Sequence, residues 1–416
     1  MRLLALTYGT EGDTRPLVML CHGLRQAGHE VLLLAEQATL SSARALDVPC
    51  AALQGDIHDE VVALVSRGNN LVAASRGLAR MAQRHTRAWM EQADAAAAGC
   101  DLVLTGGLAA LVGLSVAERH ALPAIGTGMI PLTPTRAFAS PFVPPWPLPV
   151  PRALRPLSYR LVNHAVWRTF RAPLNAARAD LGQPPRRQLW PQNLPMLYGI
   201  SPQLVPRPAD WPAHHRVCGQ WRLPAGPWTP PPALEAFLQA GPAPVYLGFG
   251  SMTGFDRERV LPALLGALAG RRVLLFPGWA GLPDTPLPAN VFVLGPTPHE
   301  ALFPRCALVI HHGGSGTTHS ACRAGVPSLV MPMAADQFFW ARRLQQLGVA
   351  PAPLSHRRLS PAVLADALAF ASLARTQARA AALGAAMADE DGVASAVEAI
   401  KTLQAEHRIR RSGAAG

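Results

Sequence analysis

The part of the sequence best equipped for chemistry is the turn His311–Thr318, which reads His-His-Gly-Gly-Ser-Gly-Thr-Thr. It follows an apolar run typical of a buried strand, Cys306–Ile310, and opens a predicted helix, Ser315–Ala324. Small residues let backbone N–H groups approach a ligand, and a helix start offers unsatisfied donors and roughly half a positive charge. Hydroxyl groups and the imidazole of His312 add further polar contacts. The turn therefore predicts a cradle for a diphosphate that needs no metal; the alternative is a Gly-rich turn that only permits tight packing.

Other phosphate and metal signatures are missing or weak. The G-x-x-x-x-G-K-[ST] pattern with its lysine does not occur here, and no G-x-G-x-x-G follows the first predicted strand. The run Asp389-Glu390-Asp391 formally matches a D-x-D metal signal. It lies at the start of the last predicted helix, where acidic side chains favour the helix dipole. We therefore expect no bound metal.

Two series of alternating strands and helices must position the turn. The first covers about the first 130 residues, and the second begins near residue 240, after a connector rich in Pro and Trp. Such alternation predicts right-handed βαβ units, a doubly wound parallel sheet in each domain, and ligand binding at the carboxyl ends of the strands. The expected strands are Arg2–Tyr8, Glu30–Ala35, Asp101–Thr105, Pro123–Thr127, Pro244–Gly250, Arg271–Phe276, Ala289–Leu294, Ala307–His311 and Ser328–Met331.

Composition limits the class of protein. The chain has 416 residues, of which 49% are hydrophobic and 15% charged, which supports large packed cores and excludes a mostly disordered chain. Six cysteines without a C-x-x-C pair argue against a zinc site or a disulfide framework and for a reducing compartment. The first apolar run is too short for a signal peptide, and no run reaches a membrane span. We expect a soluble, cytoplasmic protein, peripheral at the inner membrane face.

Residues 131–190 interrupt the alternation. They hold twelve prolines, nine arginines and one acid, Asp180, with aromatic residues in between, and Arg152–Leu181 can be helical. Arginine among aromatic residues and prolines suits an apolar ligand presented at an anionic surface. The alternative is a solvated basic loop. Nucleic acid is not expected as a partner, because no nucleic-acid-binding motif is present and the prolines oppose a regular docking face.

At this point the sequence resembles glycosyltransferase family 1, in the branch of the bacterial antibiotic glycosyltransferases and the sterol glucosyltransferases. The carboxy-terminal landmarks are highly specific, and the landmarks together span both predicted domains. The resemblance therefore implies the α/β fold called GT-B, with two doubly wound, Rossmann-like domains that face each other across a cleft. The matching segments are His311–Thr318, Arg323–Pro327, Pro332, Asp336-Gln337, Gly9–Pro16, Val245–Met252 and Pro298–Phe303.

The resemblance implies a role for each matching residue of the second domain. A carboxylate next to an amide suits vicinal sugar hydroxyls, although Asp336-Gln337 could instead only begin a helix. The diphosphate of the donor would be bound by Ser251, His312, Gly314, Ser315, Gly316 and Thr317. The donor sugar would be held by Asp336 and Gln337. The pocket for the nucleobase and ribose would be lined by Pro298 and His299, with Trp279 as a further candidate.

Asp13 is the predicted general base. It lies in the Gly-rich loop after the first predicted strand, where the similar plant enzymes carry a His backed by an Asp. With an ordinary pKa near 3.9 an aspartate is a weak base, so it would take the acceptor proton while the new C–O bond forms. Burial by the acceptor could raise its pKa. The alternative is an Asx turn that shapes the loop.

The expected reaction is an inverting, metal-independent hexosyl transfer. A hexose would pass from a UDP- or dTDP-sugar to a hydroxyl of a hydrophobic natural product, lipid or sterol, without a cofactor. The alternatives are a nucleotide-sugar epimerase or hydrolase on the same fold, and a non-catalytic helper protein. The expected domains are an acceptor-binding domain, 1–205, a linker, 206–240, a donor-binding domain, 241–390, and a C-terminal helix, 391–416, that crosses back to the first domain.

Overall fold

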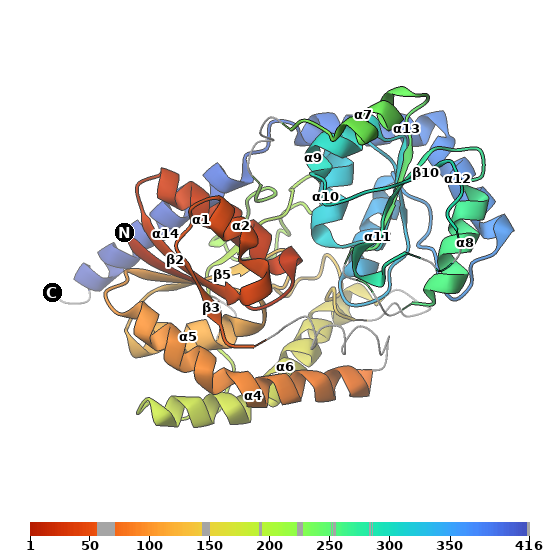
Figure 1. Ribbon diagram of the computed structural model, residues 1–416. Coiled ribbons are helices and arrows are strands. Elements are labelled where there is room, and N and C mark those ends of the chain that lie inside the picture. The colour runs from red at the N-terminus through yellow and green to blue at the C-terminus, as the bar shows by residue number, and fades with distance from the viewer. Residues whose placement is uncertain are drawn as a thin grey trace. The chain divides into compact units, whose positions relative to one another are not determined.

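The computed structural model describes residues 1–55, 71–143, 150–190, 194–222, 228–250, 252, 255–282, 284 and 286–413. The chain divides into two compact units. Among the described residues, unit 1 joins those up to Arg222 with those from Glu390 onward, and unit 2 comprises those from Trp228 to Asp389. Each unit is built on one parallel sheet with helices on both faces (Figure 1). This confirms the predicted α/β fold class.

The sheet of unit 1 reverses its strand order beside its first strand. Its order is β3-β2-β1-β4-β5-β6-β7, so the chain runs outward from β1 in one direction and returns through β4 in the other. A crevice forms beyond the carboxyl ends of the strands at such a reversal. All the pairings are parallel. The strands are β1 (Arg2–Leu6), β2 (Glu30–Glu36), β3 (Cys50–Leu53), β4 (Leu102–Thr105), β5 (Ala124–Gly128), β6 (Met196–Tyr198) and β7 (His215–Val217).

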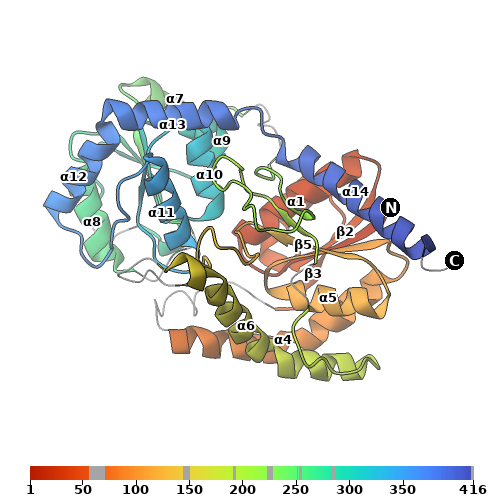
Figure 2. The ribbon, with the colours of Figure 1, turned by 180° about the vertical axis from the view of Figure 1, so that it is seen from behind.

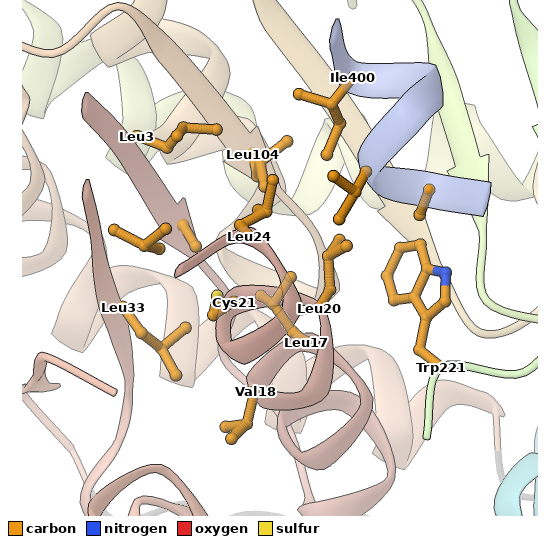
Figure 3. Packing of buried hydrophobic residues seen from close by; sticks show 14 of the residues in the cluster. Leu3, Leu17, Val18, Leu20, Cys21, Leu24, Leu33, Leu104, Trp221 and Ile400 are labelled. Atoms are coloured by element: carbon orange, nitrogen blue, oxygen red, sulfur yellow. The ribbon is translucent and has the colours of Figure 1, made fainter. Parts of the chain in front are cut away.

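Two groups of helices cover the faces of this sheet. On one face α1 and α14 pack together over the leucines of β1, β2 and β4 (Figure 3). On the other face α4, α5 and α6 form a second apolar layer. Each helix buries one apolar stripe against the strands, which fixes its rotation about its own axis. The helices are α1 (Glu11–Gln26), α2 (Ser41–Ala45), α4 (Leu71–Ala97), α5 (Ala110–Arg119), α6 (Arg155–Asp180) and α14 (Gly392–Gly413).

Helix α1 begins earlier than the sequence suggests. The spacing of Leu17, Leu20 and Leu24, with Gly28 as a stop signal, predicts a helix over Pro16–Ala27. Instead Thr10 is the N-cap, and the Asp13 carboxylate accepts a hydrogen bond from the backbone N–H of Thr10, which completes a capping box. The prediction that Asp13 lies in a loop is therefore wrong, because the reciprocal cap starts the helix at Glu11.

The smaller sheet of unit 2 repeats the reversal. Its order is β10-β9-β8-β11-β12, with the switch between β8 and β11. The strands are β8 (Val245–Gly248), β9 (Val273–Phe276), β10 (Val291–Val293), β11 (Leu308–His311) and β12 (Ser328–Val330). The helices are α7 (Pro232–Gln239), α8 (Arg257–Ala267), α9 (His299–Leu302), α10 (Ser315–Arg323), α11 (Gln337–Leu347), α12 (Pro361–Ser372) and α13 (Ala374–Met387).

The helices also bear on the question of membrane insertion. Among the described residues, no helix combines the length and the hydrophobicity that crossing a bilayer requires.

Candidate functional site

The Gly-rich turn of unit 2 lies at the strand-order reversal. Strand β11 ends at His311, Gly314 occupies the N-cap, and α10 begins at Ser315. Gly314 has no side chain with which to cap the first turn, so the N–H groups there can serve an anion. A Cβ added to Gly316 would meet no atom within 4 Å, so the turn opens at this residue. The backbone thus has the form of an anion-binding helix start.

The imidazole of His312 is held between two glycines. A Cβ on Gly314 would stand 2.5 Å from His312 Nε2, and one on Gly250 would stand 3.1 Å from His312 Cε1. Gly250, with a φ of 58°, follows β8, so the ends of β8 and β11 meet around this ring. His312 Nδ1 is buried and has no hydrogen-bond partner among the described residues. Burial, with a smaller contribution from His299, lowers the pKa of His312 to about 4. The ring is therefore neutral near pH 7.

His311 holds the backbone of the turn and was not predicted from the sequence as a site residue. Its side chain is fully buried, and its Nδ1 accepts the N–H of Gly313 at 3.1 Å. Gly313 has a φ of 92°, and a Cβ there would lie 2.9 Å from a methyl group of Val330. Burial and the neighbouring His312 and His299 lower the pKa of His311 to about 3. A permanently neutral acceptor thus fixes the backbone that precedes the helix. The sequence signals were its place as the last residue of a predicted strand and as the first residue of the Gly-rich turn.

Asp336 and Gln337 lie beside the turn, but each already has protein partners. The Gln337 carbonyl would be 3.0 Å from a Cβ on Gly313, which places the start of α11 against the turn. Asp336 occupies the N-cap, yet its carboxylate accepts the indole N–H of Trp340 at 3.0 Å and makes no cap. The Gln337 amide oxygen accepts the N–H groups of Met333 and Ala334 at 2.7 and 3.0 Å. The buried amide therefore organises its own loop.

The remaining predicted residues of unit 2 divide into three cases. Pro298 is the N-cap of α9, and His299 stacks on Phe303 with a ring separation of 4.3 Å. The backbone N–H of Trp279 donates to the Gly250 carbonyl at 2.9 Å. Because Gly250 lies against the ring of His312, Trp279 lies near that ring, and its side chain is 39% exposed. Ser251 lies outside the described residues. The structure thus gathers His299 and Trp279 near the turn.

Asp13 lies at the reversal point of unit 1. Its carboxylate accepts the Thr10 N–H at 3.1 Å and fills the space beside Gly9, where a Cβ would stand 2.2 Å from Oδ2. Burial raises the pKa of Asp13 to about 6, against the lowering effect of the Thr10 hydrogen bond. The expectation of an ordinary pKa is therefore wrong, because the protein alone supplies the burial. At pH 7 most of the carboxylate is ionised and yet more basic than a free aspartate.

The loop after β5, residues 131–140, is held by buried polar groups. The Tyr198 hydroxyl accepts the Thr133 N–H at 2.8 Å, and Asp210 accepts the Thr135 hydroxyl at 2.6 Å. The Thr133 hydroxyl also lies 2.8 Å from Nδ1 of His215, whose pKa burial lowers to about 4. This stretch of the basic segment is therefore a well-anchored loop.

Comparison with known proteins places this geometry among sugar-transferring enzymes. The profile of the erythromycin biosynthesis protein CIII-like C-terminal domain matches residues 263–403. The O-mycaminosyltylonolide 6-deoxyallosyltransferase of Streptomyces fradiae is 33% identical, over 95% of this chain and 96% of that protein. The sterol 3-beta-glucosyltransferase of Aspergillus clavatus is 30% identical over 99% of this chain, which spans only 31% of that relative's length.

Solved structures agree in fold. The glycotransferase of kitacinnamycin has a TM-score of 0.72 at 18% identity, with 96% of this chain and 98% of that chain covered. The glycosyltransferase SsfS6 of Streptomyces sp. SF2575, complexed with thymidine diphosphate, has a TM-score of 0.62 at 24% identity, with 97% and 99% covered. These likenesses concern the fold alone.

Proposed function

The chain belongs to glycosyltransferase family 1, and from that premise we propose that it transfers a hexose, with inversion, from a nucleoside diphosphate sugar to a hydroxyl of a hydrophobic acceptor. The observation that carries the proposal is the neutral His312 ring, held between Gly250 and Gly314 at an open helix start. Neutral donors and backbone N–H groups can bind a diphosphate with no metal ion or cofactor.

Unit 2 would supply the electrostatic part of the reaction. Negative charge gathers on the diphosphate as it leaves the anomeric carbon, and fixed N–H donors stabilise that charge. We assign this role to His312 and the first turn of α10, residues Ser315, Gly316 and Thr317. Gly314 and Ser251 would complete the contacts. Because burial keeps His312 neutral, it would act as a hydrogen-bond donor and not as a cation.

Unit 1 would supply the base. Asp13, whose pKa is about 6, would take the proton of the acceptor hydroxyl while the oxygen attacks the sugar. The raised pKa makes Asp13 a better base than a free aspartate and still leaves it mostly ionised at pH 7. No divalent ion is needed to activate the hydroxyl in this account.

The donor pocket is proposed from residues beside the turn. Asp336 and Gln337 would contact the sugar hydroxyls through polar atoms that their protein partners leave available, since a carboxylate oxygen has two lone pairs and an amide nitrogen two hydrogens. Pro298, His299 and Trp279 would line the nucleobase and ribose. A UDP- or dTDP-sugar would fit this proposal, and SsfS6, which has the same fold, was solved with thymidine diphosphate.

The acceptor is proposed from the relatives and from residues 131–190. The matched relatives are named for a sterol and for a macrolide lactone, and both are bulky and largely apolar. We propose an acceptor of that class, a natural product, lipid or sterol, bound by unit 1. We also propose that the basic segment brings the chain to a membrane surface.

The test is a two-stage screen. UDP- and dTDP-hexoses are first ranked by thermal shift, and the best donor is then incubated with hydrophobic alcohols and examined by mass spectrometry. We expect a mass gain of one hexose on an acceptor. Release of free sugar at an unchanged rate without any acceptor would instead indicate a hydrolase, and a changed sugar still on its nucleotide would indicate an epimerase.

A further inference from the structure

The most exposed apolar side chains of the protein gather at the start of α6. Among the described residues, Leu161, Leu154 and Leu157 are the three most exposed large hydrophobic side chains, with 63%, 52% and 46% of their surface accessible. They follow one another at intervals of three and four residues, the spacing of one helix face. Exposed leucines are ordinary when scattered, but three on one stripe form a patch.

This stripe lies opposite the face by which α6 is held in the fold. Trp167, Phe170 and Leu174 pack into the apolar layer shared with α4, and both views show α6 lying along α4 (Figures 1 and 2). At about 100° per residue, the centre of these three residues lies roughly 140° around the helix from the centre of the three leucines. Folding of unit 1 therefore does not require the exposed stripe, which we call the leucine face (Leu154, Leu157 and Leu161).

The surroundings of the leucine face are basic and contain no unpaired acid on the same helix. Arg168 continues the stripe, and Arg160 and Arg171 flank it; all three are exposed and form no ion pair among the described residues. Asp180, the one acid of α6, pairs with Arg87 at 3.2 Å. On α4, Glu91 also pairs with Arg87, and Asp94 pairs with Arg119. Among the described residues of α4 and α6, the charges left without an ion pair are therefore positive.

We infer that the leucine face and its arginines dock the protein onto an anionic phospholipid bilayer. Leucines would enter the boundary between headgroups and acyl chains, and the arginines would pair with lipid phosphates, as in amphipathic helices that lie in the plane of a membrane. A protein partner would need acidic side chains in a matching pattern. An anionic bilayer has negative headgroups above an apolar core across its whole surface. The inference sharpens the proposed membrane contact of residues 131–190 to one helix face.

The experiment is co-sedimentation with vesicles of phosphatidylcholine mixed with phosphatidylglycerol, compared with vesicles of phosphatidylcholine alone. The full chain should sediment with the mixed vesicles and much less with the neutral ones, and high salt should release it. Leu157→Gln with Leu161→Gln should weaken binding about 30-fold, from about 1 kcal/mol for each partly exposed leucine. Arg160→Gln with Arg168→Gln and Arg171→Gln should weaken binding about 100-fold at low salt.

A matched control comes from unit 2. Val363→Gln with Leu373→Gln removes two exposed apolar side chains, 40% and 39% accessible, and should leave vesicle binding unchanged. Equal binding to neutral and anionic vesicles, or an equal loss in the control, would overturn the inference. So would a leucine variant that turns a dimer into a monomer, or that raises the KM for a dissolved acceptor, without any change in vesicle binding. The assay uses neither donor nor acceptor, so its failure is distinct from failure of the transferase proposal.

Discussion

Unit 1 and unit 2 each reverse the strand order of a parallel sheet beside their first strand. The pKa values of the groups placed at these two reversals are shifted in opposite directions. Burial raises the pKa of Asp13 to about 6 and lowers that of His312 to about 4. The cause is the same in both units, because burial disfavours whichever form is charged. At pH 7 the result is a basic carboxylate in unit 1 and a neutral ring in unit 2. In the proposed reaction, the carboxylate would accept a proton and the neutral ring would donate a hydrogen bond.

The largest effect should follow from breaking the unit 1 side of this comparison. Asp13→Asn retains the side-chain oxygen that accepts the Thr10 N–H but removes the base. We expect kcat to fall about 1,000-fold, within the range typical of a general base. Donor binding, measured by isothermal titration calorimetry, should not change. A variant with full turnover would remove Asp13 from the mechanism.

The pH dependence should separate the two units. Asp13 must be ionised to act, so kcat/KM for the acceptor should fall as the pH decreases through about 6, by up to about tenfold per pH unit below it. His312 stays neutral down to about pH 4, so the Kd of the donor should be flat between pH 5 and 8. Measuring both over that range tests the assignments together. A donor affinity that rises on acidification would mean that His312 binds as a cation.

The unit 2 side is tested next by His312→Gln, which keeps a polar side chain but loses the ring held between the two glycines. We expect the Kd of the nucleoside diphosphate to rise about 10- to 100-fold, the cost of a hydrogen bond to a charged group. Thermal stability should change little, because Nδ1 of the ring has no hydrogen-bond partner among the described residues that the substitution would remove. Equal affinity in the variant and the wild type would contradict the assignment of His312 to the diphosphate.

A smaller effect is expected at His311, which acts through the backbone. Asparagine can place its amide oxygen near the position of Nδ1 and so accept the Gly313 N–H, whereas leucine cannot. His311→Leu should weaken nucleotide binding about 10-fold through loss of that hydrogen bond, and His311→Asn should restore part of the affinity. If the two variants bind nucleotide equally well, the hydrogen bond does not shape the turn.

The sequence predicted the parts of this arrangement that depend on local pattern. Apolar runs and Gly-rich turns located β1, β8 and β11, and the resemblance made His312 and Asp13 candidates for the site. The sequence did not predict contacts between distant segments. Examples are the position of Gly250 against His312 and the Gln337 amide beside Met252. The raised pKa of Asp13 was missed for the same reason. Burial depends on what packs around the start of α1, which no local pattern reports.

The most direct measurement uses Gly316, where an added methyl group would meet no protein atom within 4 Å. Gly316→Ala should therefore keep the fold, and its matched control, Gly266→Ala in α8, is equally open. We predict, in excess EDTA, that the wild type and Gly266→Ala bind UDP or dTDP alike, while Gly316→Ala binds about 10-fold more weakly, because its methyl group occupies the space of the diphosphate. Unchanged binding by Gly316→Ala, or loss of all binding in EDTA, would contradict a metal-free cradle at this turn.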